Sequence, residues 1–460
     1  MPNSTADVVI CGAGIAGISA AYHLSVHYGV KNVLIVDERP PFSLTSDKST
    51  ECYRNWWPGP GKTMVSLMNR SIDIMESIAR ETENRVNLNR RGYLFVTADP
   101  ARILAFQRAA EEAAELGAGP VRYHTGRSGE AGYVPAPAAG FENQPTGADL
   151  ITDARLIRER FPYLSEKTVA VVHPRRCGWF SAQQLAMHML ERAREHGARF
   201  AQARVEEVVI AGDRVEGVRI NDESGWSNIS TRNFVNAAGP FLPQVAGMLG
   251  IDLPVFHELH VKVAFHDPLH AVGRDAPLMI WTDPTNLPWS EEEQRMLAES
   301  DETRYLLEKF PSGVHARPEG GDDSDVVLIL WTYDVQHVNP VFPFAPHPHY
   351  PEIAFRGLSV MIPGLRAYEG RLPKPVLDGG YYTKTKENRP LVGPLPVRGA
   401  FVFGALSGYG LMAAPAAGEV LAAHVAGTEL PEYAPALSLD RYQDPEYRQL
   451  LERWDQTGQI

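Results

Sequence analysis

Three glycines near the start of the chain have the spacing of a turn that binds a dinucleotide. Gly12, Gly14 and Gly17 follow the apolar run 8–10 and open a helix of small residues, and the next apolar run ends at Asp37. The first glycine allows a tight turn, the second lets the backbone approach a pyrophosphate, and the third lets helix and strand pack closely. The helix N-terminus offers free N–H groups to phosphates, and Asp37 can accept a hydrogen bond from a ribose hydroxyl. This order of elements predicts a dinucleotide site.

The composition limits the classes of protein that the chain can belong to. Its 460 residues exceed one typical core and predict two domains or one elaborated domain. A formal net charge of −12 argues against nucleic acid or an anionic membrane surface as a partner. Three scattered cysteines are too few for a disulfide framework or a thiolate metal site. We see no signal peptide and no transmembrane segment, and we expect a cytoplasmic protein.

The rest of the chain alternates between helical and strand patterns, and it twice repeats a strand followed by a glycine turn. A capping box, Ser290 with Glu293, predicts the start of an acidic surface helix, for which a lid is the alternative role. The predicted helices cover residues 63–80, 101–116, 181–197, 290–309 and 413–425. The predicted strands cover residues 92–96, 200–205, 205–210, 214–220, 233–239, 259–265, 278–281, 326–335 and 400–404.

Four segments taken together are typical of one enzyme superfamily. They are the glycine turn 12–17, the segment 236–240, the segment 380–390, and the turn 408–412 with the helix that follows it. In order and spacing they resemble the D-amino-acid oxidase and sarcosine oxidase superfamily of FAD-dependent amine-oxidising enzymes, over nearly the whole chain. The resemblance implies an α/β fold, in which a Rossmann-like FAD-binding domain of the glutathione-reductase type is interleaved with a substrate domain on a mostly antiparallel sheet.

The resemblance also implies domain boundaries and a set of residues that bind FAD. The FAD-binding domain would comprise residues 1–90, 150–250 and 370–430, the substrate domain 91–149 and 251–369, and a helical tail 431–460. The residues assigned to FAD are Gly12, Gly14, Ile15, Ala16, Gly17, Asp37, Glu38, Arg39, Ser49, Thr50, Val205, Ala238, Gly239, Gly408, Tyr409, Gly410, Leu411 and Met412. The positions at which relatives attach flavin covalently carry no cysteine or histidine here, so we expect non-covalent FAD.

Arg54 is the residue that the resemblance assigns to a substrate carboxylate. A guanidinium group binds a carboxylate through two parallel hydrogen bonds, which suits this role. The alternative is an ordinary surface ion pair of a loop arginine. The other residues assigned to the substrate cavity are His260, Tyr381, Tyr382 and Tyr409. Tyr409 stands where relatives usually have histidine, and Met412 stands where some have a second cationic anchor, a lysine.

The segment His257-Glu258-Leu259-His260 looks like a zinc-protease motif with one residue missing. It leads into a predicted strand, where positions 257 and 260 point to opposite faces, so we expect no metal site. His260 can border the substrate cavity, or it can be an ordinary histidine of the core or the surface. Lys262 is a candidate for activating oxygen near the flavin, although it lies outside the matching motif.

The function implied by the resemblance is FAD-dependent oxidation of a carbon–nitrogen bond in a secondary amine or amino acid. Hydride would pass from carbon to flavin, and water would hydrolyse the imine. The electron acceptor could be oxygen, a quinone or a carrier protein, and no residue stands out as a general base. One alternative is a dehydrogenase for a 2-hydroxy acid or polyol phosphate, since one fold serves many reactions. Another is a non-catalytic flavoprotein that acts in assembly or binding.

Overall fold

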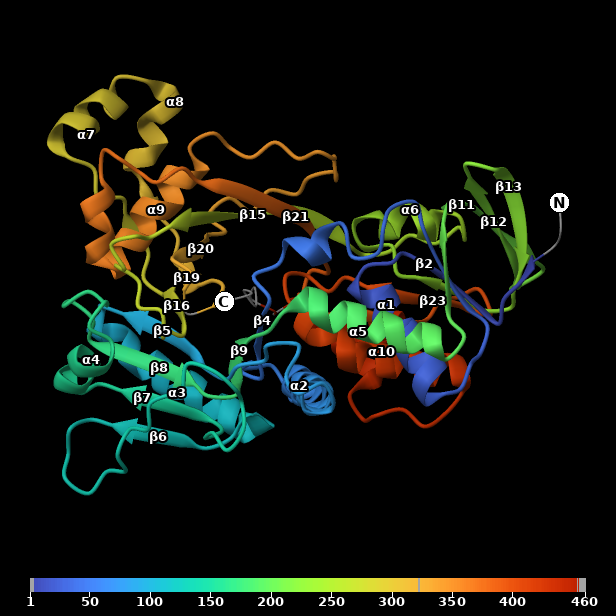
Figure 1. Cartoon of the computed structure of the whole chain (residues 1–460), viewed down its shortest axis with the longest axis horizontal. Helices are drawn as coiled ribbons and strands as arrows, with labels where there is room; N and C mark the ends of the chain where they lie inside the picture. The colour runs from blue at the N-terminus through green and yellow to red at the C-terminus, as the bar shows by residue number, and fades with distance from the viewer. Residues whose placement is uncertain (1–3, 322, 453, 455–460) are drawn as a thin grey trace.

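The protein has two lobes, each built on its own large sheet (Figure 1). The computed structural model describes residues 4–321, 323–452 and 454. The first lobe contains a six-stranded sheet in which five strands are parallel and only the edge strand β22 is antiparallel. Its strand order is β10 (Arg199–Gln202), β3 (Val33–Asp37), β2 (Val8–Cys11), β14 (Phe234–Asn236), β23 (Ala400–Gly404) and β22 (Leu391–Pro394).

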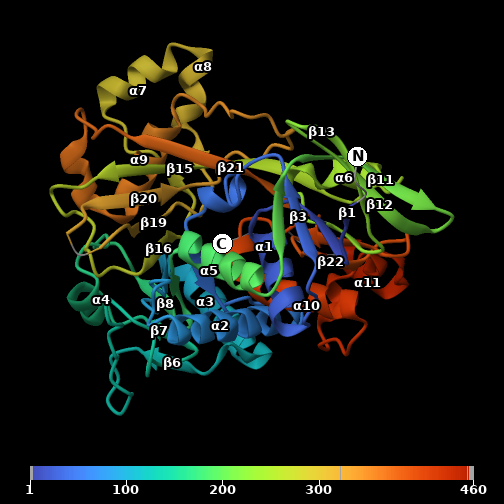
Figure 2. The ribbon, with the colours of Figure 1, turned by 45° about the vertical axis from the view of Figure 1, so that its right-hand side comes forward.

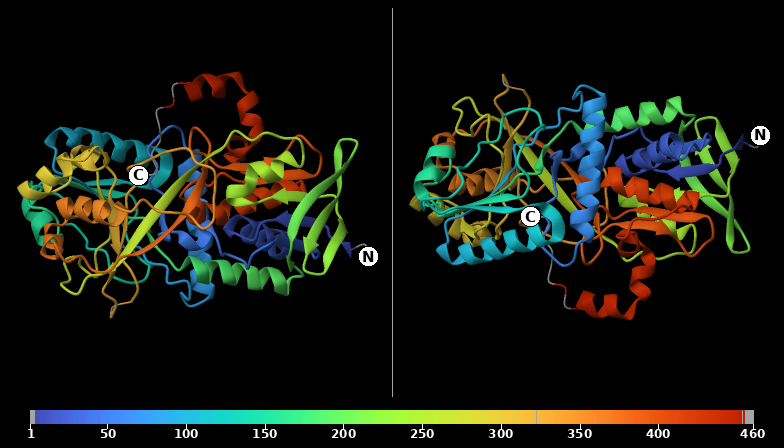
Figure 3. Two further views of the ribbon diagram at one scale, coloured as in Figure 1. Left: turned by 90° about the horizontal axis from the view of Figure 1, so that it is seen from above. Right: turned by 90° about the horizontal axis from the view of Figure 1, so that it is seen from below.

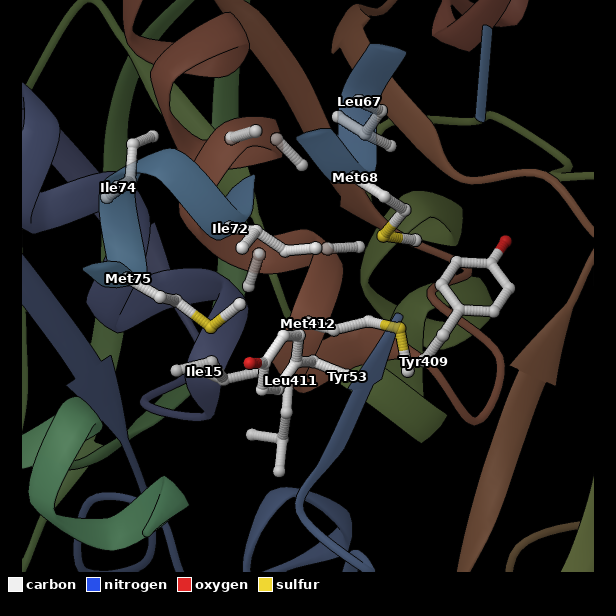
Figure 4. Close-up of a cluster of buried hydrophobic side chains, with 14 of the residues drawn as sticks. Ile15, Tyr53, Leu67, Met68, Ile72, Ile74, Met75, Tyr409, Leu411 and Met412 are labelled. Atoms are coloured by element: carbon white, nitrogen blue, oxygen red, sulfur yellow. The ribbon is translucent and has the colours of Figure 1, made fainter. Parts of the chain in front are cut away.

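Four helices pack around the glycine turn of this lobe. They are α1 (Ile15–Tyr22), α2 (Thr63–Glu81), α5 (Ala182–Glu195) and α10 (Gly410–Ala426). Figure 4 shows side chains of Ile15, Met75 and Leu411, from α1, α2 and α10, in one buried apolar cluster. Helix α1 approaches α10 so closely that a Cβ atom at Gly418 would lie 2.2 Å from Ser19 Oγ. The close approach requires glycine at position 418. The helices therefore pack closely around the turn.

A smaller sheet and a short helix complete the first lobe. The sheet joins β1 (Ser4–Thr5), β13 (Gly225–Ser230), β12 (Arg214–Asp222) and β11 (Arg204–Ala211), and α6 (Leu242–Gly247) follows β14. The predicted hairpin is β11 and β12, and β13 is an additional strand that the sequence pattern did not indicate.

The second lobe contains a nine-stranded, mostly antiparallel sheet, which confirms the predicted fold class. Its order is β21 (Val376–Lys384), β15 (Phe256–His266), β20 (Val326–Leu330), β19 (His315–Pro318), β16 (Leu278–Trp281), β5 (Tyr93–Thr97), β8 (Ala170–Pro174), β7 (Ala148–Ile151) and β6 (Val121–His124). Helices α3 (Ile103–Ala113), α4 (Ala154–Arg160) and α9 (Tyr350–Met361) pack on it. In Figure 2, β15 and β21 run side by side toward the first lobe.

Strand β15 separates the core of the second lobe from the space between the lobes. Successive side chains of a strand point to opposite faces. Val261, Val263 and Phe265 belong to the apolar core. Phe256, Glu258 and His260, at even-numbered positions, point to the other face, where they line a cavity.

The domain boundaries differ from the expected ones at two places. Strands β7 and β8, which extend into the segment 150–250 assigned to the cofactor domain, pair in the nine-stranded sheet. Strand β21, from the segment 370–430, pairs with β15 of the same sheet. Pairing between segments remote in the chain depends on tertiary hydrogen bonds, and no local pattern records it. A two-stranded sheet of β4 (Cys52–Arg54) and β9 (Cys177–Trp179) links the two lobes.

Two further expected elements take a different form. The predicted helix 290–309 is split into α7 (Glu291–Ala298) and α8 (Asp301–Arg304), because Ser300 caps a new helix. The capping box at Ser290 is confirmed. Helices α7 and α8 bury no residue, and two short strands, β17 (Thr285–Asn286) and β18 (Lys309–Phe310), flank them. The predicted strand 326–335 ends at Leu330.

The predicted helical tail contains short helical turns and α11 (Pro445–Glu452), which lies on the outside of the molecule (Figure 3). Residues 453 and 455–460 of that tail lie outside the described residues. Among the described residues, no helix has the length and apolar character needed to cross a membrane.

Candidate functional site

The glycine turn opens onto a cavity of about 420 Å³ at the carboxyl ends of β2 and β3. Gly12 has a φ of +112°, a backbone conformation that favours glycine. A Cβ atom at Gly17 would lie 1.9 Å from the carbonyl oxygen of Gly12, so α1 can approach the turn only with glycine there. These two positions show the roles that the spacing predicted for the first and third glycines.

Asp37 is fixed at the end of β3, on the wall of the same cavity. Its Oδ2 accepts a hydrogen bond from the backbone N of Ala13 at 2.7 Å, and its Oδ1 accepts one from the backbone N of Arg39 at 2.9 Å. Burial raises the pKa of this carboxyl above its usual value, and the two backbone donors counteract the shift. Each oxygen keeps a further lone pair for a ribose hydroxyl.

A narrower cavity of about 90 Å³ continues from the first toward the second lobe. The two cavities share Gly14, Thr45, Ser46, Ala237, Gly239 and Pro240. Ser46 Oγ accepts a hydrogen bond from the backbone N of Ile15 at 3.1 Å, at the N-terminus of α1. This is the position at which the glycine turn can present N–H groups to a pyrophosphate.

A third cavity of about 390 Å³ lies on the face of the nine-stranded sheet. It meets the narrow cavity at Tyr382 and Gly408, which line both. The turn 408–411 ends in the N-terminus of α10, so N–H groups and the positive end of a helix dipole lie at this junction. The three cavities form one path from Asp37 to the second lobe.

The residues along the path fit an extended dinucleotide whose reactive ring lies at the junction of the narrow and the third cavity. Asp37 and the glycine turn supply a ribose acceptor and phosphate donors at one end. Gly239, with a φ of +56°, has open space where a Cβ atom would be, so the backbone wall there can lie flat against a ligand. The turn 408–411 supplies backbone N–H groups at the other end. The path therefore has the chemistry that FAD requires.

The cofactor residues named from the sequence lie along this path, with one exception. Gly17 lines none of the three cavities and acts instead through the close packing of α1. The first cavity is lined by Gly12, Gly14, Asp37, Glu38, Arg39, Val205, Ala238 and Gly239. The narrow cavity is lined by Gly14, Ile15, Ala16, Ser49, Gly239, Gly408, Gly410 and Leu411. The third cavity is lined by Thr50, Gly408, Tyr409 and Met412.

Arg54, on β4, is buried in the wall of the third cavity. Its guanidinium lies 4.5 Å from the ring centroid of Trp57 and 6.0 Å from that of Tyr93. Burial lowers the pKa of Arg54, yet a guanidinium with such a high pKa stays charged at neutral pH. The structure thus holds a buried cation close to two aromatic rings, and Arg54 does not lie on the surface.

The aromatic residues assigned to the substrate take two positions. Tyr382 and Tyr409 line the third cavity, and the ring of Tyr409 meets Trp57 edge-on at 5.1 Å. Tyr381 lines the narrow cavity and donates a hydrogen bond from its hydroxyl to the carbonyl oxygen of Val341. His260 lies in the third cavity against Tyr382, with ring centroids 3.8 Å apart and planes at 23°.

Lys262 lies on the same face of β15 as His260, but it lines none of the three cavities. Its Nζ donates a hydrogen bond to the carbonyl oxygen of Ser49 at 2.9 Å. Burial lowers the pKa of Lys262, and Asp378, with Oδ2 4.0 Å away, counteracts the shift. The lysine joins β15 to the loop that borders the narrow cavity.

Several polar residues of the third cavity were missed by sequence reasoning. Glu258, Thr332 and Lys384 line it together with His315 and Lys386. Glu258 and His260 belong to one local motif, with a spacing of two on a strand, and Lys384 and Lys386 lie in the segment 380–390, in which neither had an assigned role. The charged residues of the wall are three cations, Arg54, Lys384 and Lys386, and one carboxylate. The wall thus carries an excess of positive side chains in a chain whose net charge is −12.

The first lobe is an α/β fold, and its cavities lead to the mostly antiparallel sheet of the second lobe. This is the architecture of a two-domain FAD-dependent oxidoreductase. Residues 7–424 match the family described as FAD dependent oxidoreductase (DAO), and the chain belongs to this family. The resemblance inferred from the four motifs is confirmed.

Similar proteins span both lobes. The chain is 22% identical to FAD-dependent oxidoreductase domain-containing protein 1 of Bos taurus, over 92% of this chain and 81% of that protein. Its fold is similar to L-proline dehydrogenase from P. horikoshii, with a TM-score of 0.71 and 19% identity over 96% and 99% of the two chains. It is also similar to glycine oxidase from Geobacillus kaustophilus, with a TM-score of 0.70 and 16% identity over 95% and 99%.

Proposed function

We propose that the protein oxidises the carbon–nitrogen bond of a secondary amine or amino acid that carries a carboxylate. The observation that carries this proposal is Arg54, a buried cation in the cavity that meets the reactive end of the FAD path. A proline dehydrogenase and a glycine oxidase share the fold, and the substrates in their names are carboxylated amines. FAD, held non-covalently, would supply the acceptor for the hydride, and water would hydrolyse the resulting imine.

Each of these cavity residues would contact a different part of the substrate. Arg54 would hold the carboxylate through paired hydrogen bonds, which fixes the carbon next to nitrogen against the junction at Gly408. Tyr382 and Tyr409 would form apolar walls that keep water away from the reacting bond. Oxygen, a quinone or a carrier protein would then reoxidise the flavin.

Anaerobic mixing of the FAD-loaded protein with a panel of substrates tests the class of reaction. The panel contains secondary amines, amino acids, 2-hydroxy acids and polyol phosphates, and the measurement is bleaching of the oxidised-flavin absorbance. We expect carboxylated amines to bleach the flavin. Bleaching by hydroxy acids or polyol phosphates alone would favour the other enzyme class, and no bleaching at all would favour a binding role.

Matched substrate pairs test the role of Arg54. Proline and pyrrolidine share the reacting bond, as do N-methylglycine and dimethylamine, and only the first of each pair has a carboxylate. Loss of two charge-assisted hydrogen bonds of about 1.5 kcal/mol each predicts a roughly 100-fold weaker Kd for the carboxylated member in Arg54→Ala. Pyrrolidine and dimethylamine should change less than threefold, and Arg54→Lys should be intermediate. Arg80→Ala, on the exposed side of α2, is the control, and equal losses for both members of a pair would contradict the proposed role.

A further inference from the structure

Glu258, His260 and Thr332 form a hydrogen-bonded chain on the wall of the substrate cavity. His260 Nε2 lies 3.0 Å from Glu258 Oε2, and His260 Nδ1 lies 2.9 Å from Thr332 Oγ1. The three residues line the third cavity. Glu258 and His260 lie on one face of β15, while Thr332 comes from the segment that follows β20.

The hydrogen-bond acceptors among these three residues determine where the protons lie. An ionised carboxylate can only accept hydrogen bonds, so the proton of His260 is on Nε2 and points to Glu258. Nδ1 is then an acceptor, and the hydroxyl of Thr332 donates to it. The hydroxyl oxygen of Thr332 keeps its lone pairs for a group in the cavity.

The surroundings favour a neutral histidine beside a charged glutamate. Burial lowers the pKa of His260, and the adjacent Glu258 counteracts the shift. Burial opposes ionisation of Glu258, but the hydrogen bond from His260 and the charge of Lys384 outweigh it and lower the pKa of Glu258. Lys384 Nζ lies 3.0 and 3.2 Å from the two carboxylate oxygens.

The neighbouring strands carry the remaining groups that face His260. Tyr382 of β21 stacks on the imidazole ring and restricts its rotation. His315 of β19 is buried, which lowers its pKa to about 4, with Arg54 and His260 contributing, so it adds no charge at neutral pH. His260 is thus the neutral, oriented base of the cavity, with a carboxylate behind it to stabilise a positive charge.

We propose that Glu258, His260 and Thr332 are a proton relay that deprotonates the substrate ammonium before the carbon–nitrogen bond is oxidised. The relay deepens the proposed function and rests on it. Aliphatic amines are mostly protonated at neutral pH, and an ammonium nitrogen has no lone pair to assist departure of a hydride from the adjacent carbon. A base in the cavity removes this obstacle.

The proton moves in one concerted transfer that conserves atoms and charge. The N–H bond of the ammonium breaks, its electron pair stays on nitrogen, and the proton binds Thr332 Oγ1. The hydroxyl proton of Thr332 passes at the same time to His260 Nδ1. The positive charge of the ammonium is then on the imidazolium, hydrogen-bonded to Glu258. After product release the imidazolium returns its proton to water in the cavity, and the relay is restored. Thr332 and His260 are catalytic residues in this scheme, and Glu258 and Tyr382 are positioning residues.

The pH dependence of flavin reduction in Thr332→Val distinguishes a relay from a merely structural network. The rate is followed anaerobically from pH 6 to 10 with the amine of the panel that bleaches the flavin fastest. Without the hydroxyl, only substrate that is already neutral reacts, so the rate falls about tenfold per pH unit below the pKa of that amine. For an amine with a pKa of about 9, we expect the loss relative to the wild type to be largest at low pH and to fall to less than threefold at pH 10, where most of the substrate is already neutral. Thr332→Ser keeps the hydroxyl and should follow the wild type. The same loss at every pH, or no loss at pH 7, would overturn the relay.

Nitrogen NMR of ¹⁵N-histidine-labelled, FAD-loaded protein tests the relay without any substrate. We expect a neutral His260 at pH 7 with its proton on Nε2, assigned by comparison with His260→Gln. A charged His260, or a proton on Nδ1, would overturn the relay, because neither form can accept the proton from Thr332. Failure of every amine to bleach the wild-type flavin would instead contradict the proposed function, so the two hypotheses fail separately.

Discussion

Replacing Gly17 by alanine is a sharp test of how the glycine turn binds the cofactor. The new Cβ atom would lie 1.9 Å from the carbonyl oxygen of Gly12 and 3.3 Å from Ile10 Cγ2. An ordinary contact is about 3.4 Å, so α1 would have to move by about 1.5 Å. The turn is held in place, because Gly12 N donates to the carbonyl oxygen of Val36. Helix α1 is buried on all sides, so its displacement disturbs the packing around it.

The displacement weakens both packing and phosphate binding. Overpacking of this kind costs about 1–3 kcal/mol of stability. The same shift moves the N–H groups of α1 away from the pyrophosphate. A loss of about 2 kcal/mol in binding corresponds to a roughly 30-fold higher Kd for FAD. Titration of the apoprotein with FAD, followed by quenching of flavin fluorescence, measures the Kd, and thermal unfolding of the apoprotein measures the effect on packing.

Gly247→Ala is the matched control. Gly247 is also helical, but no atom lies within 4 Å of the position of its Cβ, and its φ is not left-handed. Alanine in a helix is favoured over glycine by up to about 1 kcal/mol, so the midpoint of unfolding should stay or rise, and the Kd for FAD should not change. If Gly17→Ala bound FAD as the wild type does, the steric argument for the third glycine would be refuted.

Three further predictions concern the cofactor and the stability of the fold. Acid precipitation should release all flavin into the supernatant, and a fluorescent flavin band on a denaturing gel would contradict non-covalent binding. His23 has a pKa lowered to about 3, chiefly by burial, so an unfolded chain with a histidine pKa near 6.5 takes up the proton first as the pH falls. The stability present above pH 6.5 is lost toward pH 3, by about 2 kcal/mol at pH 5. In His23→Gln the difference in unfolding free energy between pH 7 and pH 5, from urea titrations, should shrink by that amount, and an unchanged difference would refute the linkage. Arg441→Met removes the cation that lies 2.7 Å from the buried carboxylate of Glu387, and should lower the unfolding free energy by about 3 kcal/mol or more. The double variant Glu387→Gln/Arg441→Met should recover part of this loss, and wild-type stability of the single variant would show that the pair contributes nothing.

The cofactor half of the site could be predicted from the sequence because its requirements are local. Gly12 needs a left-handed backbone, Gly17 needs the absence of a Cβ atom, and Asp37 needs only to follow the second strand. Each requirement involves neighbours within one βαβ unit, so it can be recognised from residue type and spacing. The capping box at Ser290 was predictable for the same reason.

The substrate half could be predicted only in part. Arg54 and His260 were named, but Thr332 was placed within a strand that in fact ends at Leu330. Lys384 was part of a motif without any assigned role. The roles of Thr332 and Lys384 depend on contacts with His260 and Glu258 of β15. Glu258 lies opposite Tyr382 in the register of β15 and β21.

The sequence by itself determined the class of fold, the ligand of the glycine turn and the family. The tertiary structure decided which side chains share the third cavity. It also showed that β7, β8 and β21 belong to the nine-stranded sheet. The physical reason is the range of the interactions. Backbone conformation and helix capping act over a few residues, whereas sheet pairing and the contact between His260 and Thr332 join segments far apart in the chain.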